Sequence, residues 1–134
     1  MAELRREVRF IRADEDVVAA RQIVRELAVL VGFSLVDQTK VVTAASELAR
    51  NVLQHGGGGT LTASALNDDN RRGLRLIFED QGPGIADIQL AMKDGYTSGG
   101  GLGLGLGGAK RLSNEFEIDS TPGTGTRVTI ARWK

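Results

Sequence analysis

The sequence predicts a two-layer α/β sandwich in which helices cover one face of a mixed, largely antiparallel sheet. Apolar residues recur at helical spacing over two long segments in the N-terminal half, and they alternate with polar residues over five shorter segments. Four of the alternating segments form two pairs, and a short turn-forming stretch separates the members of each pair, as in β-hairpins. Hairpins combined with long helices favour two packed layers.

The N-terminal half is expected to hold one strand and two helices. The alternating residues 8–12 predict an edge strand, and Asp14 is positioned to cap the helix that follows. Gly32 should end this helix, and Ser34 should cap a second helix that continues to His55. The expected buried stripes are Val17, Ala20, Val24, Leu27 and Val31 in the first helix, and Val42, Ala45, Leu48 and Val52 in the second.

The C-terminal half is expected to hold two hairpins with helical segments between them. Asn and Asp mark one hairpin turn, and Pro and Gly mark the other, because these residue types accept turn conformations. In chain order, the expected elements are a strand over 60–66, a polar turn over 67–70, a strand over 73–79, a short helix over 87–92, a loop over 93–101, a helix over 104–112, and strands over 115–120 and 125–132 joined by Pro122-Gly123-Thr124.

Length and composition exclude several classes of protein. The chain of 134 residues is expected to form one domain over residues 1–134. Its 17 Lys and Arg residues balance 17 Asp and Glu residues, which argues against nucleic acid as a partner. Cysteine is absent, which removes disulfides and thiolate metal sites. The longest apolar run, residues 27–31, is too short to cross a bilayer, and the charged residues 1–7 lack the apolar core of a signal peptide. We therefore expect a cytoplasmic protein without a membrane partner.

A carboxylate at the end of the strand over 73–79 is the first candidate functional group. Asp80 has the same parity as the apolar residues of that strand, so it is predicted to point to the covered side of the sheet. A carboxylate directed at a core requires hydrogen-bond donors. Gly82 and Gly84 follow without side chains, and together the three residues predict a seat for a planar ring that carries an amino group. The alternative is an aspartate that caps a Gly-Pro-Gly turn.

The second helix carries a polar stripe beside its apolar one. Glu47, Asn51 and His55 follow one another at steps of four residues, which places their side chains on one helix face. A carboxylate and an amide one turn apart can hold a hard cation and orient a hydroxyl group or a water molecule. Mg²⁺ favours such sparse oxygen ligation, completed by phosphate and water. The alternative is a solvated polar face.

The glycine-rich residues 99–108 lead into the predicted helix over 104–112. Backbone N–H groups at the start of a helix attract anions, so this segment predicts a polyphosphate site. A flexible linker is the alternative. Gly103, Gly105 and Gly108 also match the dinucleotide fingerprint, but no predicted strand precedes them, as that fingerprint requires.

Four segments, taken in order, resemble one known ATP-binding domain. They are Glu47-Leu48-Ala49-Arg50-Asn51, Asp80-Gln81-Gly82-Pro83-Gly84, Gly101-Leu102-Gly103-Leu104-Gly105-Leu106 and Gly123-Thr124-Gly125-Thr126. Their order and spacing resemble the Bergerat fold that histidine kinases, DNA gyrase and anti-sigma-factor serine kinases share, and the resemblance covers essentially the whole chain. Within that family, residues 46–51, 79–84 and 94–100 are most similar to the RsbT-type serine kinases of the bacterial stressosome.

The resemblance implies a role for each matched residue. Glu47 is the candidate general base, and Asn51 is the implied Mg²⁺ ligand. Asp80 would accept a hydrogen bond from the adenine amino group, and residues 93–100 would form a lid. Gly82 and Gly84 would line the adenine pocket with support from Thr126, and the backbone around the glycine run would hold the phosphates. The residues implied to bind ATP are Asn51, His55, Asp80, Gly82, Gly84, Gly101, Leu102, Gly103, Gly105 and Thr126.

The resemblance also implies a reaction and partners. The expected activity is that of an ATP- and Mg²⁺-dependent protein serine/threonine kinase, with STAS-domain proteins as substrates and scaffold. Released from these proteins, the kinase would activate a serine phosphatase of a stress-response pathway. The alternative function is a nucleotide-gated binding module, such as an anti-sigma factor that sequesters a sigma factor. A dinucleotide-dependent enzyme is a third, weaker hypothesis.

Overall fold

The computed structural model describes residues 1–85, 88–92 and 105–134. Five strands form one sheet in the order β1-β2-β3-β5-β4, and each neighbouring pair is antiparallel. The strands are β1 (Ala2–Ile11), β2 (Gly59–Asp68), β3 (Arg71–Asp80), β4 (Glu115–Thr121) and β5 (Gly125–Trp133). Both predicted hairpins are confirmed, since β2 pairs with β3 and β4 pairs with β5. The described part of the sheet is therefore wholly antiparallel rather than mixed.

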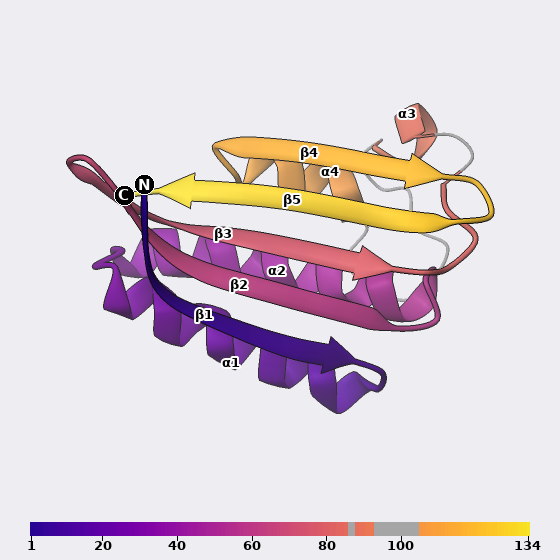
Figure 1. The fold of residues 1–134 in the computed structure, drawn as a ribbon, viewed down its shortest axis with the longest axis horizontal. Coiled ribbons are helices and arrows are strands. Elements are labelled where there is room, and N and C mark those ends of the chain that lie inside the picture. Colours follow the sequence, from indigo (N-terminus) through magenta and orange to yellow (C-terminus); the bar gives the residue numbers. More distant parts are fainter. Residues whose placement is uncertain (86–87, 93–104) are drawn as a thin grey trace.

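The helices α1 (Asp14–Leu30), α2 (Leu35–Gln54) and α4 (Gly105–Arg111) lie on the same face of this sheet (Figure 1). The short helix α3 (Ile88–Ala91) lies near the end of the sheet where β3 stops. Each residue of the two predicted helical stripes is buried, and these residues join the inward side chains of β2, β3 and β5 in one core. The predicted two-layer sandwich is confirmed. No helix in the described ranges is long and apolar enough to cross a membrane.

The start of α1 differs from the prediction. Asp14 was expected to be the N-cap, but it is the first helical residue, and the N-cap is Ala13. The capping carboxylate belongs to Asp16, whose Oδ2 accepts hydrogen bonds from the backbone N–H groups of Arg12 (2.9 Å) and Ala13 (3.1 Å). A side chain at the third helical position can reach back to the N-cap, whereas one at the first position points away from it. The predicted end of α1 and both predicted limits of α2 are confirmed, with Gly32 at a φ of +86° and Ser34 as the cap of α2.

β1 begins at Ala2, six residues before the predicted edge strand at 8–12. It is an edge strand, as predicted, and its Cα register with β2 extends from Ile11–Gly59 to Ala2–Asn67. Most of its residues are exposed on both faces, so the apolar alternation that marks a half-buried strand is missing from its first half. Pairing with β2, rather than the local pattern, therefore defines this strand.

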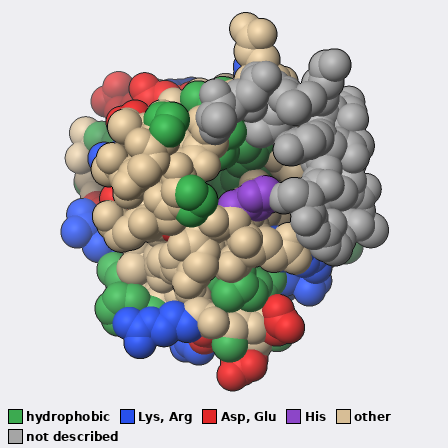
Figure 2. All heavy atoms as spheres, turned by 90° about the vertical axis from the view of Figure 1, so that its right-hand side faces the viewer, with side chains coloured by type: hydrophobic (Ala, Val, Ile, Leu, Met, Phe, Trp, Pro, Cys, Tyr) green, Lys and Arg blue, Asp and Glu red, His purple; other side chains and the backbone are tan. Residues whose placement is uncertain are grey.

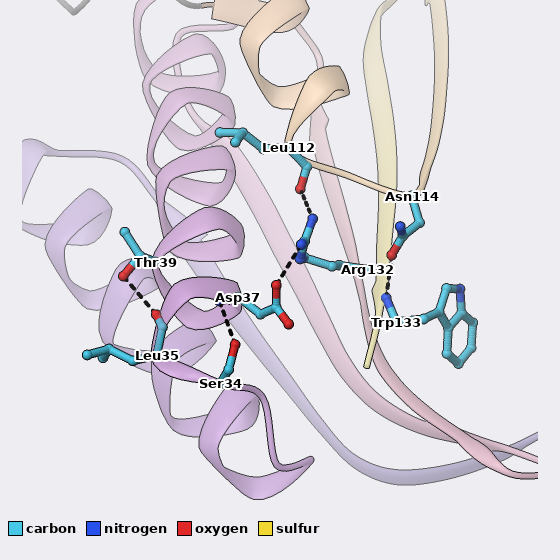
Figure 3. A network of polar contacts seen from close by, with 8 residues as sticks. All are labelled: Ser34, Leu35, Asp37, Thr39, Leu112, Asn114, Arg132 and Trp133. Carbon is cyan, nitrogen blue, oxygen red and sulfur yellow. Dashed lines mark hydrogen bonds and ion pairs between the residues drawn. The ribbon is translucent and has the colours of Figure 1, made fainter.

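Arg132 on β5 ties the two layers together (Figure 3). Its side chain is 14% exposed, Nη2 donates to Asp37 Oδ1 in α2 at 2.7 Å, and Nη1 donates to the carbonyl oxygen of Leu112 after α4 at 2.8 Å. The hydrogen bond from Arg132 is the main reason that the pKa of Asp37 lies below its ordinary value of 3.8. One side chain thus fixes β5 against both helices.

Candidate active site

The predicted polar stripe of α2 runs from the core to the surface. Glu47 is buried, Asn51 is half-buried, and His55, which caps the helix, is exposed. Asn51 Nδ2 is buried and lacks a hydrogen-bond partner among the residues that the structure describes. A buried amide without a partner is costly, which points to a group outside the described chain that completes it. The alternative interpretation, a solvated polar face, is therefore wrong for Glu47 and Asn51.

Glu47 forms one ion pair among the residues that the structure describes. Arg50 Nη1 lies 3.2 Å from Glu47 Oε1, one helical turn away, and the two side chains are 36% and 7% exposed. Burial of a carboxylate is unfavourable unless it is paired, and the guanidinium group provides that pairing. Sequence reasoning quoted Arg50 only as part of a motif. Its spacing of three residues from the candidate base Glu47 was the available signal.

Asp80 points toward the helix layer, as the strand parity predicted. Its Oδ1 accepts a hydrogen bond from the backbone N–H of Gly82 at 2.9 Å. A Cβ atom built on Gly56, just after α2, would overlap the Asp80 side chain and would lie 2.7 Å from Oδ2. No described residue donates a hydrogen bond to Oδ2. The carboxylate therefore caps the local turn with one oxygen and keeps the other as an acceptor, so the two predicted roles of Asp80 are compatible.

Gly82 and Gly84 are explained first by contacts within the chain. A Cβ on Gly82 would lie 2.6 Å from the Cα of Gly56, and one on Gly84 would lie 2.5 Å from the carbonyl oxygen of Thr121. Gly84 also has a φ of +78°, a conformation that side-chain-bearing residues rarely adopt. The turn after β3 thus packs closely on α2 and on β4. The proposed contact of these glycines with a planar ring stays a prediction.

Thr126 lies beside Asp80, because the two residues are Cα partners in the β3–β5 register and their side chains share a face. Thr126 Oγ1 is 2.8 Å from Ser120 Oγ, and Ser120 Oγ accepts a hydrogen bond from the backbone N–H of Ile85 at 2.7 Å. Ser120 therefore links two strands to the turn that contains Gly84. Sequence reasoning missed Ser120, since only the pairing of β4 with β5 brings it to this site.

The predicted phosphate-binding segment is described only in part. Gly105 opens α4 with a φ of +53°, and Leu106 and Ala109 of that helix are buried against the core. Gly101, Leu102, Gly103 and the lid at 93–100 lie outside the described residues. The predicted role of the glycine run in phosphate binding stays a prediction.

The described site residues gather at one end of the sheet. The C-terminal end of α2, the end of β3 and the turn between β4 and β5 meet there, and Gly56 and Gly125 contact Asp80 from two sides. Figure 2 faces this end, where the one purple side chain is the only histidine of the chain. In the part of the chain that the structure describes, no three His, Asp or Glu residues are grouped as a metal site. A cation at this end would therefore depend on a ligand for most of its coordination.

Comparison with known proteins connects this arrangement to a family. The family described as histidine kinase-, DNA gyrase B- and HSP90-like ATPase matches residues 36–134. The chain is 46% identical to the serine/threonine-protein kinase RsbT of Bacillus subtilis (strain 168), over 92% of both chains. It is 29% identical to the anti-sigma F factor of Thermoanaerobacter sp. (strain X514), over 95% of this chain and 92% of that relative.

Two solved structures have the same fold. One contains the RsbU and RsbW domains of Rv1364c from Mycobacterium tuberculosis and aligns with a TM-score of 0.64 at 19% identity. That alignment covers 97% of this chain and 33% of the solved chain. The other is a histidine kinase domain from Erythrobacter litoralis EL346, with a TM-score of 0.53, 20% identity, and 87% and 59% of the two chains covered. At these identities the likeness establishes the fold alone.

Proposed function

The chain belongs to the family of histidine kinase-, DNA gyrase B- and HSP90-like ATPases and is an RsbT-type serine/threonine kinase, and from this premise we propose its reaction, its cation and its partners. It transfers the γ-phosphoryl group of ATP to a serine or threonine of an STAS-domain protein. Mg²⁺ accompanies the nucleotide. The main support is the buried Glu47 together with the half-buried Asn51, whose buried amide nitrogen has no partner among the described residues.

Asp80 is the proposed adenine-recognition residue. The N–H of Gly82 holds Asp80 Oδ1, so Oδ2 is oriented to accept a hydrogen bond from an exocyclic amino group. The neighbouring Thr126 hydroxyl, held by Ser120, lies on the same face of the sheet. A hydrogen bond to an ionised acceptor contributes about 1.5–3 kcal/mol, enough to select a purine that carries an amino group.

Glu47 is the proposed general base. It accepts the proton of the acceptor hydroxyl while that oxygen forms a bond to the γ-phosphorus atom of ATP. The bond between the γ-phosphorus and the β–γ bridging oxygen breaks, and its electron pair leaves with ADP. The Asn51 side chain suits Mg²⁺ through its amide oxygen, and the cation when bound supplies neutralisation of phosphate charge. The protein contributes mainly by positioning the reacting groups and by excluding part of the water from them.

The proposed partner switching has two states, one in which the kinase is bound to STAS-domain proteins and one in which it is released. We propose that STAS-domain proteins act both as substrates and as the scaffold that retains the kinase, and that phosphorylation releases it. The released chain then activates a serine phosphatase of a stress-response pathway. The 46% identity to RsbT over 92% of both chains supports this assignment over more distant functions in the family.

The direct test is phosphoryl transfer to a cognate STAS-domain protein. The protein, Mg²⁺ and ATP labelled at the γ-phosphate are incubated with that partner, which is then analysed for phosphoserine and phosphothreonine. We expect Glu47→Gln to abolish transfer while ATP affinity, measured by calorimetry, stays within a few fold. Undiminished labelling by Glu47→Gln would show that Glu47 is not the base, and no labelling by the unaltered chain would refute the kinase reaction on this partner.

A second candidate function has its own support. The chain is 29% identical to an anti-sigma F factor over 95% of its length, which favours a nucleotide-gated binding module that sequesters a sigma factor. The two functions separate when sigma-factor binding is measured with and without ATP. Nucleotide-dependent binding by both the unaltered chain and Glu47→Gln would favour sequestration, because binding does not need the base.

A further inference from the structure

The ion pair between Arg50 and Glu47 carries an inference that rests on the proposed function and extends it. The two residues lie one turn apart on α2, and Arg50 Nη1 is 3.2 Å from Glu47 Oε1. The side chain of Glu47 is 7% exposed, so its carboxyl group has little contact with water. In the described ranges no second cation lies within 4.0 Å of this carboxylate.

The two carboxylate oxygens of Glu47 differ in their hydrogen-bond partners. Oε1 is engaged by the guanidinium group of Arg50, and no described residue donates a hydrogen bond to Oε2. A base must have one oxygen available to the hydroxyl group of the substrate and must be held in one orientation. A guanidinium group paired with the other oxygen achieves both, because it restricts rotation of the carboxylate and leaves the second oxygen available.

We propose that Arg50 is a positioning residue for phosphoryl transfer, which holds the Glu47 carboxylate in one orientation through Oε1 and leaves Oε2 as the proton acceptor. Arg50 itself takes no proton and contacts no phosphate in this scheme. In the transfer step the hydroxyl proton moves to Oε2, the hydroxyl oxygen bonds to the γ-phosphorus, and ADP leaves with the electron pair of the broken P–O bond. The effect of Arg50 should therefore appear in turnover and not in nucleotide affinity.

The test compares Arg50→Gln, Arg50→Lys and a matched control in the full chain. Lys40→Gln removes one positive charge from the same helix, at an exposed position far from Glu47. For Arg50→Gln we expect kcat for transfer to the STAS-domain partner to fall by at least tenfold, with KM and ATP affinity within threefold of the unaltered chain. Arg50→Lys should recover most of the lost turnover, and Lys40→Gln should change none of these quantities by more than twofold.

A structural role would give a different pattern. If Arg50 only stabilised the fold, Arg50→Gln would lower the melting temperature and ATP affinity together, and equal turnover per folded molecule would overturn the proposal. A change confined to KM would also overturn it, because Arg50 would then contact the substrate protein. Arg50→Gln leaves the buried carboxylate of Glu47 without its partner. The double variant Glu47→Gln/Arg50→Gln carries neither charge of the pair and therefore provides a second comparison. That double variant should fold and bind ATP normally, and it should be no less active than Glu47→Gln alone.

The outcomes also separate this inference from the proposed function. If the unaltered chain transfers phosphate and Glu47→Gln does not, but Arg50→Gln keeps full turnover, the base assignment stands and the positioning role is wrong. If Glu47→Gln transfers phosphate at the unaltered rate, the base assignment fails first, and Arg50→Gln is then expected to be fully active as well.

Discussion

Gly56 and Asp80 are in direct contact, with the Cα of Gly56 against the carboxylate of Asp80. A Cβ atom on Gly56 would overlap Cβ and Cγ of Asp80 and would lie 2.7 Å from Oδ2. The contact joins the end of α2, which carries the proposed base, to the end of β3, which carries the proposed adenine acceptor. The absence of one side chain therefore allows the two halves of the site to meet.

Replacing Gly56 with alanine should disturb nucleotide binding directly. The added methyl group must displace the Asp80 carboxylate, and overpacking of this kind costs about 1–3 kcal/mol. We expect Gly56→Ala to weaken ATP binding by tenfold or more in calorimetry. Gly57→Ala is the matched control, because Gly57 has a φ of +72° and no atom lies within 4 Å of the position that the new methyl group would take. It should lower the melting temperature through backbone strain and leave affinity within threefold.

Asp80→Asn tests the adenine assignment. The amide oxygen can still accept from the Gly82 N–H, so the turn is retained, but an NH₂ group then faces the adenine amine. We expect a loss of about 1.5–3 kcal/mol in ATP binding by calorimetry. Glu79→Gln, one residue earlier and on the opposite face of the sheet, is the control and should leave affinity unchanged. Equal affinities for all three proteins would refute the assignment.

Ser120→Ala should loosen the adenine side of the site. The hydroxyl group accepts from the Ile85 N–H and bonds to Thr126 Oγ1, so its removal leaves two groups without their partner. We expect ATP affinity to fall by roughly three- to tenfold, the effect of about 1 kcal/mol per lost hydrogen bond. Ser113→Ala removes a hydroxyl group bonded to the Ala109 carbonyl oxygen and serves as the control. Similar effects of both variants on affinity would argue against a positioning role of Ser120.

The ion pair between Asp37 and Arg132 should make stability dependent on pH. The pKa of Asp37 is lowered in the folded state, chiefly by the hydrogen bond from Arg132. A lowered folded-state pKa stabilises the fold above the unfolded pKa, and this contribution is lost as the pH falls through the folded value. We expect Asp37→Asn to reduce the free energy of unfolding by about 1 kcal/mol at pH 7 and by less at pH 3, measured with urea. A difference that grows toward acid pH would contradict this explanation.

The cap of α1 can be tested with two neighbouring aspartates. Asp16 accepts two backbone hydrogen bonds, and the one from Arg12, followed by the side-chain hydrogen bond from Arg9, lowers its pKa. Asp14 lies at the first helical position and has no described side-chain partner. We expect Asp16→Ala to lower the melting temperature by several degrees and Asp14→Ala to change it little. Equal shifts would show that general charge at the helix start, and not the cap, matters.

Much of this molecule follows from local pattern. Spacing of apolar residues predicted both long helices and their buried stripes, because a helix must bury one continuous face wherever it packs. Strand parity predicted the direction of Asp80 for a similar reason, since alternation is a property of the strand itself. The steps of four residues along α2 placed Glu47 and Asn51 together without any knowledge of the rest of the fold.

What the tertiary structure decided depends on contacts between distant segments. Four features depend on register, packing or competition among nearby groups. They are the cap at Asp16, the first half of β1, the approach of Gly56 to Asp80 and the position of Ser120. Arg132 illustrates the reason, since its partners Asp37 and Leu112 lie 95 and 20 residues away in the chain. The sequence alone thus determined which residues are candidates to carry the chemistry, because local geometry selects them. Packing determined how they are held, because the neighbours that restrain a side chain come from segments whose distance and orientation no local pattern encodes.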